Sequence, residues 1–202
     1  MEATIGSRHS LIFFAALFFL IILLAIQTAA VQELDAQAVI AVARFRCPAL
    51  TGFMKTITFL GTKAFLVPAT AIVTAILFSQ RNRQRLVFPA VMLAAWFSME
   101  GLKLLFARPR PEFSPLLTES SPSFPSGHAF MGTLFFGFLT ALLISRTPSP
   151  PGKRLTLAAA CLFLFLLGFS RIYLGVHYPT DVLAGYAGGL FFLGLAGPGR
   201  QN

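Results

Sequence analysis

Long apolar stretches alternate with short polar links along most of this chain. Six of the stretches are long enough to cross roughly 30 Å of hydrocarbon as helices, because a helix rises about 1.5 Å per residue. They cover residues 10–31, 57–79, 86–106, 129–145, 155–174 and 180–197. The pattern predicts an all-α, polytopic membrane protein, a six-transmembrane-helix bundle that forms a single domain over residues 1–202.

Two segments near the beginning of the chain allow more than one interpretation. Residues 10–31 follow Arg8 and end close to the small residues Ala29 and Ala30, which is also typical of a cleaved signal peptide. The length of the apolar stretch, with no extracellular domain after it, favours a retained span. Residues 33–50 mix apolar and charged side chains, so we expect a partly amphipathic helix along the membrane surface.

Composition supports a membrane protein and disfavours several other classes. Of the 202 residues, 56% are hydrophobic and only 11% are charged, whereas soluble domains carry roughly 25% charged residues. The net charge of +9 could indicate a nucleic-acid partner, but the cations stand in short clusters between apolar stretches, so no nucleic acid is expected. Cys47 lies in a polar loop and Cys161 in an apolar stretch, which favours neither a disulfide framework nor a thiolate metal site.

The distribution of charge predicts which loops face the cytoplasm. The links after the second and fourth spans carry cations and no acids, and such loops favour the cytoplasmic side. These cations are Arg81, Arg83, Arg85, Arg146, Lys153 and Arg154. Every acid except Glu2 then falls on the outward side. Lys103, Arg110 and Arg171 are outward cations that break this bias, and catalysis is one reason for such an exception.

Three outward segments carry unusual polar groups, and each group taken singly has a structural explanation in snorkelling or helix capping. The segments are Lys103 to Pro111 at the end of the third span, Pro125 to His128 at the start of the fourth, and Ser170 to Asp181 between the fifth and sixth. Together they place cations, two histidines and a carboxylate at the outer ends of neighbouring spans. Cations and the N-terminus of a helix bind oxyanions, so the group predicts a phosphate-handling site.

These segments resemble the signature motifs of the type-2 phosphatidic acid phosphatase family, K-x(6)-R-P, P-S-G-H and S-R-x(5)-H-x(3)-D. All three occur in order with unbroken spacing, and the six-span layout is similar to the compact bacterial membrane branch over nearly the whole chain. Arg108 and Arg110 are both followed by proline, but only Arg110 has the family spacing from Lys103.

The resemblance implies a role for each motif residue. His177 would attack phosphorus and become a phosphohistidine, Asp181 would orient it, and His128 would protonate the leaving oxygen and then activate water. The residues that would hold the phosphoryl oxygens are Lys103, Arg110, Ser126, Gly127 and Arg171. No metal ion or other cofactor is expected. Glu100 lies one turn before Lys103, a spacing at which the two side chains can pair, so that Glu100 would support the lysine without binding phosphate itself.

The implied function is hydrolysis of a lipid phosphomonoester or diphosphate at the outward face of a bacterial plasma (inner) membrane. The expected partners are the membrane lipid substrate and the bilayer. The number of cations, with Arg108 included, favours a polyprenyl diphosphate such as undecaprenyl diphosphate over phosphatidylglycerophosphate. Two alternatives stay open: a lipid-to-lipid phosphotransferase with the same site, and an anion transporter, which polar groups at only one end of the spans disfavour. The oligomeric state is not indicated.

Overall fold

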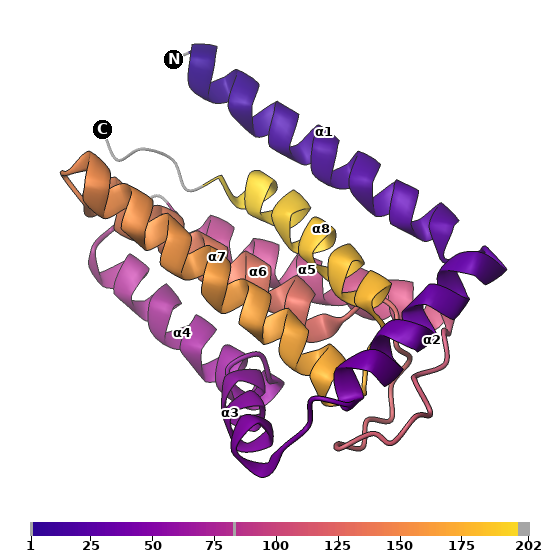
Figure 1. Ribbon diagram of the computed structural model, residues 1–202. Coiled ribbons are helices and arrows are strands. Elements are labelled where there is room, and N and C mark those ends of the chain that lie inside the picture. The colour runs from indigo at the N-terminus through magenta and orange to yellow at the C-terminus, as the bar shows by residue number, and fades with distance from the viewer. Residues whose placement is uncertain (1, 83, 198–202) are drawn as a thin grey trace.

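The computed structural model describes residues 2–82 and 84–197, and all regular elements within these residues are helices (Figure 1). They are α1 (Glu2–Ala25), α2 (Ala29–Ala43), α3 (Pro48–Phe59), α4 (Lys63–Ser79), α5 (Gln84–Phe106), α6 (Gly127–Arg146), α7 (Pro150–Tyr173) and α8 (Pro179–Ala196). By length and composition, α1, α5, α6, α7 and α8 can each cross a membrane, and the bent pair α3–α4 adds a sixth span if it is one unit. The prediction of an all-α, six-span membrane protein is therefore confirmed.

The first predicted span is shorter in the structure than the apolar pattern indicated. The stretch 10–31 does not continue to its end, because α1 ends at Ala25 and α2 begins at Ala29. Thr28 accepts a hydrogen bond from the Val31 N–H at 3.4 Å, which satisfies one of the free N–H groups of the new helix. A threonine cap inside an otherwise apolar stretch thus starts a second helix in a new direction.

The second predicted span is interrupted. Within 57–79 the chain leaves the helix at Leu60 and re-enters it at Lys63, so that α3 and α4 meet at an angle of 42°. Thr62 accepts a hydrogen bond from the Phe65 N–H at 3.3 Å and caps α4. A single straight helix over 57–79 was therefore wrong, and the break places Gly61 beside the motif residue His128.

The segment 33–50, predicted as one surface helix, is divided between α2 and α3 by a break at residues 44–47. Helix α2 packs across the ends of α7 and α8 (Figure 1). Its carboxylate Asp35 is only 3% exposed and points into the protein. The amphipathic pattern therefore indicated a helix correctly, but the polar Asp35 belongs to the buried face of α2 and not to a solvated one.

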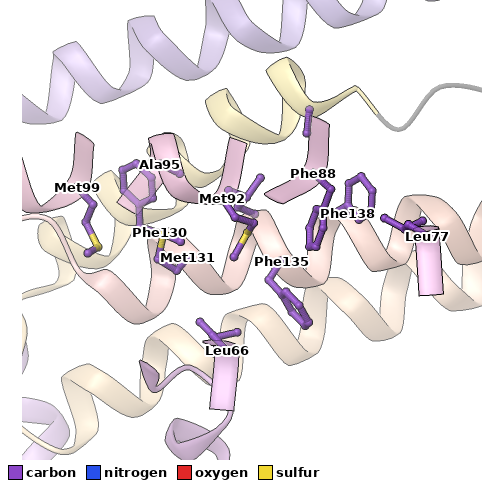
Figure 2. Packing of buried hydrophobic residues seen from close by; sticks show 12 residues of the cluster. Leu66, Leu77, Phe88, Met92, Ala95, Met99, Phe130, Met131, Phe135 and Phe138 are labelled. Atoms are coloured by element: carbon purple, nitrogen blue, oxygen red, sulfur yellow. The ribbon is translucent and has the colours of Figure 1, made fainter. Parts of the chain in front are cut away.

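Helix α6 forms the centre of the bundle, with α4, α5, α7 and α8 packed around it (Figure 1). Figure 2 shows how aromatic and methionine side chains of α5 and α6 interdigitate, including the rings of Phe88 and Phe138, whose centroids lie 4.2 Å apart. Leu66 and Leu77 of α4 belong to the same core. Because lipid tails are as apolar as these side chains, close packing rather than exclusion from water holds the helices together.

Small residues let α8 approach α6 very closely. A Cβ atom added at Gly185 would lie 2.7 Å from the carbonyl oxygen of Ser126, and one at Gly189 would lie 2.5 Å from that of Phe130. Both neighbours are backbone atoms, which cannot move aside as a flexible side chain can. The glycines therefore bring the first turns of α6 and α8 together, and these turns carry the second and third motifs.

The basic links and the motif residues lie at opposite ends of the bundle. At one end Arg146 donates a hydrogen bond to Gln80 at 2.8 Å, which joins the α4–α5 and α6–α7 links. Arg83, counted in the charge pattern, lies outside the described residues. At the other end lie α2, the long connection between α5 and α6, and the short segment 174–178 (Figure 1).

Candidate active site

His177 lies in the segment between α7 and α8 and is only 2% exposed. Its Nε2 lies 3.3 Å from Arg110 Nη1, and its Nδ1 lies 3.3 Å from Ser123 Oγ and 3.5 Å from Asp181 Oδ2. A guanidinium can only donate hydrogen bonds, so Nε2 must carry the lone pair and Nδ1 the proton. This arrangement selects the tautomer in which the ring has a free electron pair on the side of Arg110.

Burial lowers the pKa of His177 from its ordinary value of 6.5 to about 4, although Asp181 opposes this by stabilising the protonated ring. The nearby cations Arg171 and Arg110 add to the depression of the pKa. The imidazole is therefore neutral at physiological pH, which a nucleophile requires.

Ser123 connects the histidine to the carboxylate. Its Oγ donates to Asp181 Oδ2 at 2.5 Å, which leaves its lone pairs to accept the proton of His177 Nδ1. The same Asp181 oxygen accepts the Tyr178 N–H at 2.9 Å, at the beginning of α8. Asp181 is fully buried, so its capping role, considered in the sequence, and its contact with His177 occur together. Sequence reasoning missed Ser123, because one serine in a serine-rich loop carries no distinguishing pattern.

Arg108 does not point toward the same space as Arg110. Its Nη1 donates to Asp181 Oδ1 at 2.6 Å and its Nη2 to Asp35 Oδ2 at 2.8 Å, while its guanidinium covers the Tyr178 ring at 4.4 Å. Burial alone would lower the pKa of Arg108, but the two carboxylates raise it above its ordinary value. Motif spacing assigned Arg110, and not Arg108, to the phosphate site, and the structure places the two arginines accordingly in different positions.

Lys103 and Arg110 converge on the loop between α5 and α6. Lys103 Nζ donates to the carbonyl of Pro122 at 2.6 Å, and Arg110 Nε donates to the carbonyl of Ser121 at 2.7 Å. Arg110 also donates to the carbonyl of Val176 at 2.7 Å, beside His177. Backbone carbonyls thus orient both cations, and a lysine ammonium still has two further protons to offer.

Arg171 is almost completely buried near the end of α7. Its Nη1 donates to Thr58 Oγ1 at 2.8 Å, and its Nη2 forms a close ion pair with Glu119 of the α5–α6 loop. Burial alone would raise the pKa of Glu119, but the neighbouring Arg171 keeps it below its ordinary value. Glu119 was not predicted as a site residue, because the sequence gives no indication that its loop folds back over α7.

The second motif begins α6. Ser126 is the residue before the helix, its N–H donates to the carbonyl of Asp181 at 3.0 Å, and Gly127 and His128 form the first turn. The ring of His128 lies directly against Gly61, where an added Cβ would stand 2.6 Å from the His128 Cδ2. The break between α3 and α4 thus presents a residue without a side chain to this histidine.

These groups surround one cavity of about 380 Å³. Its polar part is lined by Lys103, Arg110, Glu119, Ser121, Gly127, His128, Arg171 and His177. Its apolar part runs between α4, α5 and α6 and is lined by Leu66, Val67, Pro89, Met92, Leu93, Trp96, Met99 and Met131. The structure therefore brings the predicted residues of all three motifs to one place, with Asp181 behind His177 and Ser126 behind Gly127.

Glu100 borders the same cavity, but its ion pair is with Lys63 at 3.1 Å and not with Lys103. The pairing expected from helical spacing is thereby corrected. Lys63, at the first turn of α4, also lies over the Trp96 ring at 4.4 Å. Among residues 2–82 and 84–197, no three His, Cys, Asp or Glu side chains are grouped so that they could hold a metal ion.

Comparison with known proteins gives consistent relatives. Residues 84–198 match the PAP2 superfamily. The chain is 39% identical over 185 residues to phosphatidylglycerophosphatase B of Bacillus subtilis, covering 88% of this chain and 89% of that protein.

Two solved structures are also similar. The crystal structure of the transmembrane PAP2-type phosphatidylglycerolphosphate phosphatase from Bacillus subtilis matches with a TM-score of 0.85 and 36% identity, over 92% of this chain and 93% of that one. Aquifex aeolicus LpxE matches with a TM-score of 0.63 and 26% identity, over 81% of this chain and 94% of that one. With a family match over more than half of its length and relatives of the same architecture, this chain belongs to the PAP2 superfamily of membrane phosphatases.

Proposed function

We propose that this membrane lipid phosphatase hydrolyses its substrate through a covalent phosphohistidine on His177, with the phosphoryl group held in the polar part of the cavity. One observation carries the proposal. Three buried polar atoms around this part, Ser126 Oγ, His128 Nε2 and Arg171 Nε, have no hydrogen-bond partner within the described chain. Of the eight such atoms in the described chain, these three belong to the second and third motifs, and buried polar atoms normally have a partner. Each can donate a proton, so the oxygen atoms of a phosphoryl group would satisfy all three.

The proposed first step forms a P–N bond and breaks the P–O bond of the ester. His177 Nε2 attacks phosphorus, His128 gives its proton to the leaving oxygen, and the dephosphorylated lipid departs. In the second step His128 takes a proton from water, whose oxygen attacks phosphorus, and the P–N bond breaks to release phosphate and neutral His177. Asp181 stabilises the positive ring in between.

The cations serve mainly to position and neutralise the phosphoryl oxygens, which is most of what phosphoryl transfer requires of a protein. The proposed ligands are the side chains of Lys103, Arg110, Ser126 and Arg171, together with the N–H of Gly127 at the start of α6. Glu119 occupies one side of Arg171. We propose that residues 1–202 act as one unit, because the site combines side chains from most of the helices.

The apolar part of the cavity suits the substrate's lipid chain. From Met99 to Pro89 it follows α5 over ten residue steps, or about 15 Å of helix. Val67 of α4 and Leu93 of α5 line it and are also 55% and 59% exposed on the protein surface. In a bilayer these exposed faces contact lipid, so the space between α4 and α5 offers lateral access for a lipid.

The structure leaves fewer cations free to bind a diphosphate than the sequence indicated. Arg108 does not line the cavity and is shared by two carboxylates, and Arg171 is paired with Glu119. This leaves Lys103 and Arg110 without a carboxylate partner among the described residues. Together with the name of the Bacillus subtilis relative, this charge balance favours a lipid phosphomonoester, and we propose phosphatidylglycerophosphate as the better substrate.

The nucleophile is tested by His177→Ala. We expect turnover to fall by a factor of about 10³ or more, because no other group can form the covalent intermediate. Labelled substrate should leave an acid-labile phosphoenzyme on the wild type and none on the variant. His9→Ala is the matched control, since His9 is exposed on α1. Wild-type turnover by His177→Ala would overturn the proposed function.

The pH profile tests the protonation states. Because the pKa of His177 is lowered to about 4, its neutral form persists as the pH falls. The decline of kcat/KM on the acidic side of the pH profile (the acid limb), which reports the free enzyme, should therefore lie near pH 4 rather than 6.5. The ionisation of the substrate phosphate is measured by phosphorus NMR in the detergent micelles used for the assay, and the pH profile is corrected for it. Turnover should also persist in EDTA. A limb at pH 6.5, or restoration of lost activity by Mg²⁺, would contradict the proposed mechanism.

The lipid site is tested by Val67→Trp, which fills the apolar part of the cavity. We expect KM for phosphatidylglycerophosphate to rise by about tenfold with kcat little changed, the pattern for lost ground-state binding. Turnover of a water-soluble monophosphate, which we expect to be poor in the wild type, should not change. Leu162→Trp on the lipid-facing surface of α7 is the control.

The wild type should also prefer phosphatidylglycerophosphate to a polyprenyl diphosphate by kcat/KM, and the reverse order would contradict the charge argument.

We propose that the site faces outward from a bacterial plasma membrane, and the charge of the loops supports this orientation. Cys47 and Cys161 are exposed free thiols, so both are first replaced by serine. A cysteine at Lys153 should then resist a membrane-impermeant thiol reagent in intact cells, and one at Ser114 should react. The opposite pattern of labelling would place the site in the cytoplasm.

A further inference from the structure

We infer that Asp35, on α2, is a positioning residue for the reaction: by sharing Arg108 with Asp181 it restores the negative charge that Asp181 presents to His177. Helix α2 lies outside all three motifs. The inference rests on the proposed roles of His177 and Asp181. It extends them to a helix whose sequence gave only an amphipathic pattern.

The contacts of Asp35 hold it firmly at the beginning of α8. Its Oδ2 accepts from Arg108 Nη2 at 2.8 Å and from the hydroxyl of Thr180, and its Oδ1 accepts from the Thr180 N–H at 3.1 Å. The carboxylate is 3% exposed, so water does not replace these partners. Thr180 and Asp181 are adjacent in the chain, and Asp35 thus contacts the helix turn that carries the catalytic carboxylate.

Arg108 links Asp35 to Asp181. Its two terminal nitrogen atoms face different carboxylates, Asp35 at 2.8 Å and Asp181 at 2.6 Å, and its flat face rests on Tyr178. Arg108 Nη1 also donates to Thr180 Oγ1 at 2.9 Å. The planar guanidinium is therefore fixed in orientation, and a lysine could not make the same pair of contacts.

The charges in this group explain why two carboxylates are needed. One guanidinium paired with Asp181 alone would give a neutral pair. With Asp35 included, the group has a net charge of −1, and Asp181 places its second oxygen toward His177. When His177 Nε2 bonds to phosphorus and Nδ1 keeps its proton, the ring becomes positive. A net negative group stabilises that ring, which is only 2% exposed and so gains little stabilisation from bulk solvent.

A purely structural role for Asp35 makes a different prediction. In that case it would only attach α2 to the first turn of α8, and its loss would change stability but not the protonation of His177. The charged or titratable groups that face His177 directly are Asp181, Arg171, Arg110, Glu119 and His128. None belongs to α2, so the route by which Asp35 most strongly affects His177 is the pairing of Arg108 with both Asp35 and Asp181.

The first test is Asp35→Asn, which keeps the shape and removes the charge. We expect kcat to fall roughly 10- to 100-fold, as when a group that orients a reacting residue is lost. The acid limb of the pH profile should move to lower pH, because a less negative group stabilises the protonated ring less. The inhibition constant for inorganic phosphate should not change, since the phosphoryl ligands are untouched. Glu33→Gln, an exposed acid on the same helix, is the matched control and should resemble the wild type.

The double variant Asp35→Asn with Arg108→Gln gives the decisive comparison. It removes one charge of each sign, so Asp181 again contributes a net charge of −1. The acid limb should return to the wild-type position, even if kcat does not fully recover. Folding of Asp35→Asn is judged by gel filtration and thermal unfolding in detergent. If this variant fails to fold, the test rests on comparing the acid limb of the double variant with that of the wild type. An unshifted limb in folded Asp35→Asn, or a limb in the double variant that lies below the wild-type position, overturns the inference.

Failure of this inference and failure of the proposed function give different results. If the wild type forms no phosphohistidine, the role of His177 itself is wrong. If the phosphohistidine forms on the wild type but Asp35→Asn matches it in kcat and in the acid limb, only the role of Asp35 is wrong.

Discussion

The close approach of α6 and α8 is the constraint on which the site depends. The second motif begins α6 and the third ends at the beginning of α8, so neither can act unless the two first turns touch. They touch because glycines replace side chains where α8 meets backbone oxygens of α6. The Ser126 N–H then reaches the carbonyl of Asp181 at 3.0 Å. The helix end that offers N–H groups to an anion is thereby fixed beside the carboxylate that holds His177.

Much of this arrangement could be predicted from the sequence. The spans followed from apolar length, and the convergence of Lys103, His128 and His177 followed from their shared position at the outer ends of neighbouring spans. The uneven distribution of cations among the loops also distinguished the two ends of the bundle. These features depend on long or repeated patterns, which a single sequence displays well.

The remainder depends on individual contacts between segments distant in the chain. Asp35 is a polar position in an amphipathic helix, and only the packing of α2 on α8 shows that it faces inward. Ser123 and Glu119 lie in a loop without periodicity, where sequence gives no direction for a side chain. The interruption at Gly61 was missed because the apolar pattern continues through it, and a threonine cap is a weaker signal than twenty apolar residues.

The two-part shape of the cavity has a consequence for how the reaction ends. Its polar part is bordered by loops, and its apolar part is bordered by the lipid-exposed Val67 and Leu93. Cleavage therefore divides the products between two phases, with phosphate dissolving in water and the remaining lipid diffusing in the plane of the bilayer. In the proposed two-step reaction the lipid leaves first and phosphate follows after hydrolysis, each by its own route. The departing lipid therefore does not block the entry of water or the exit of phosphate, and release of both products needs no moving part.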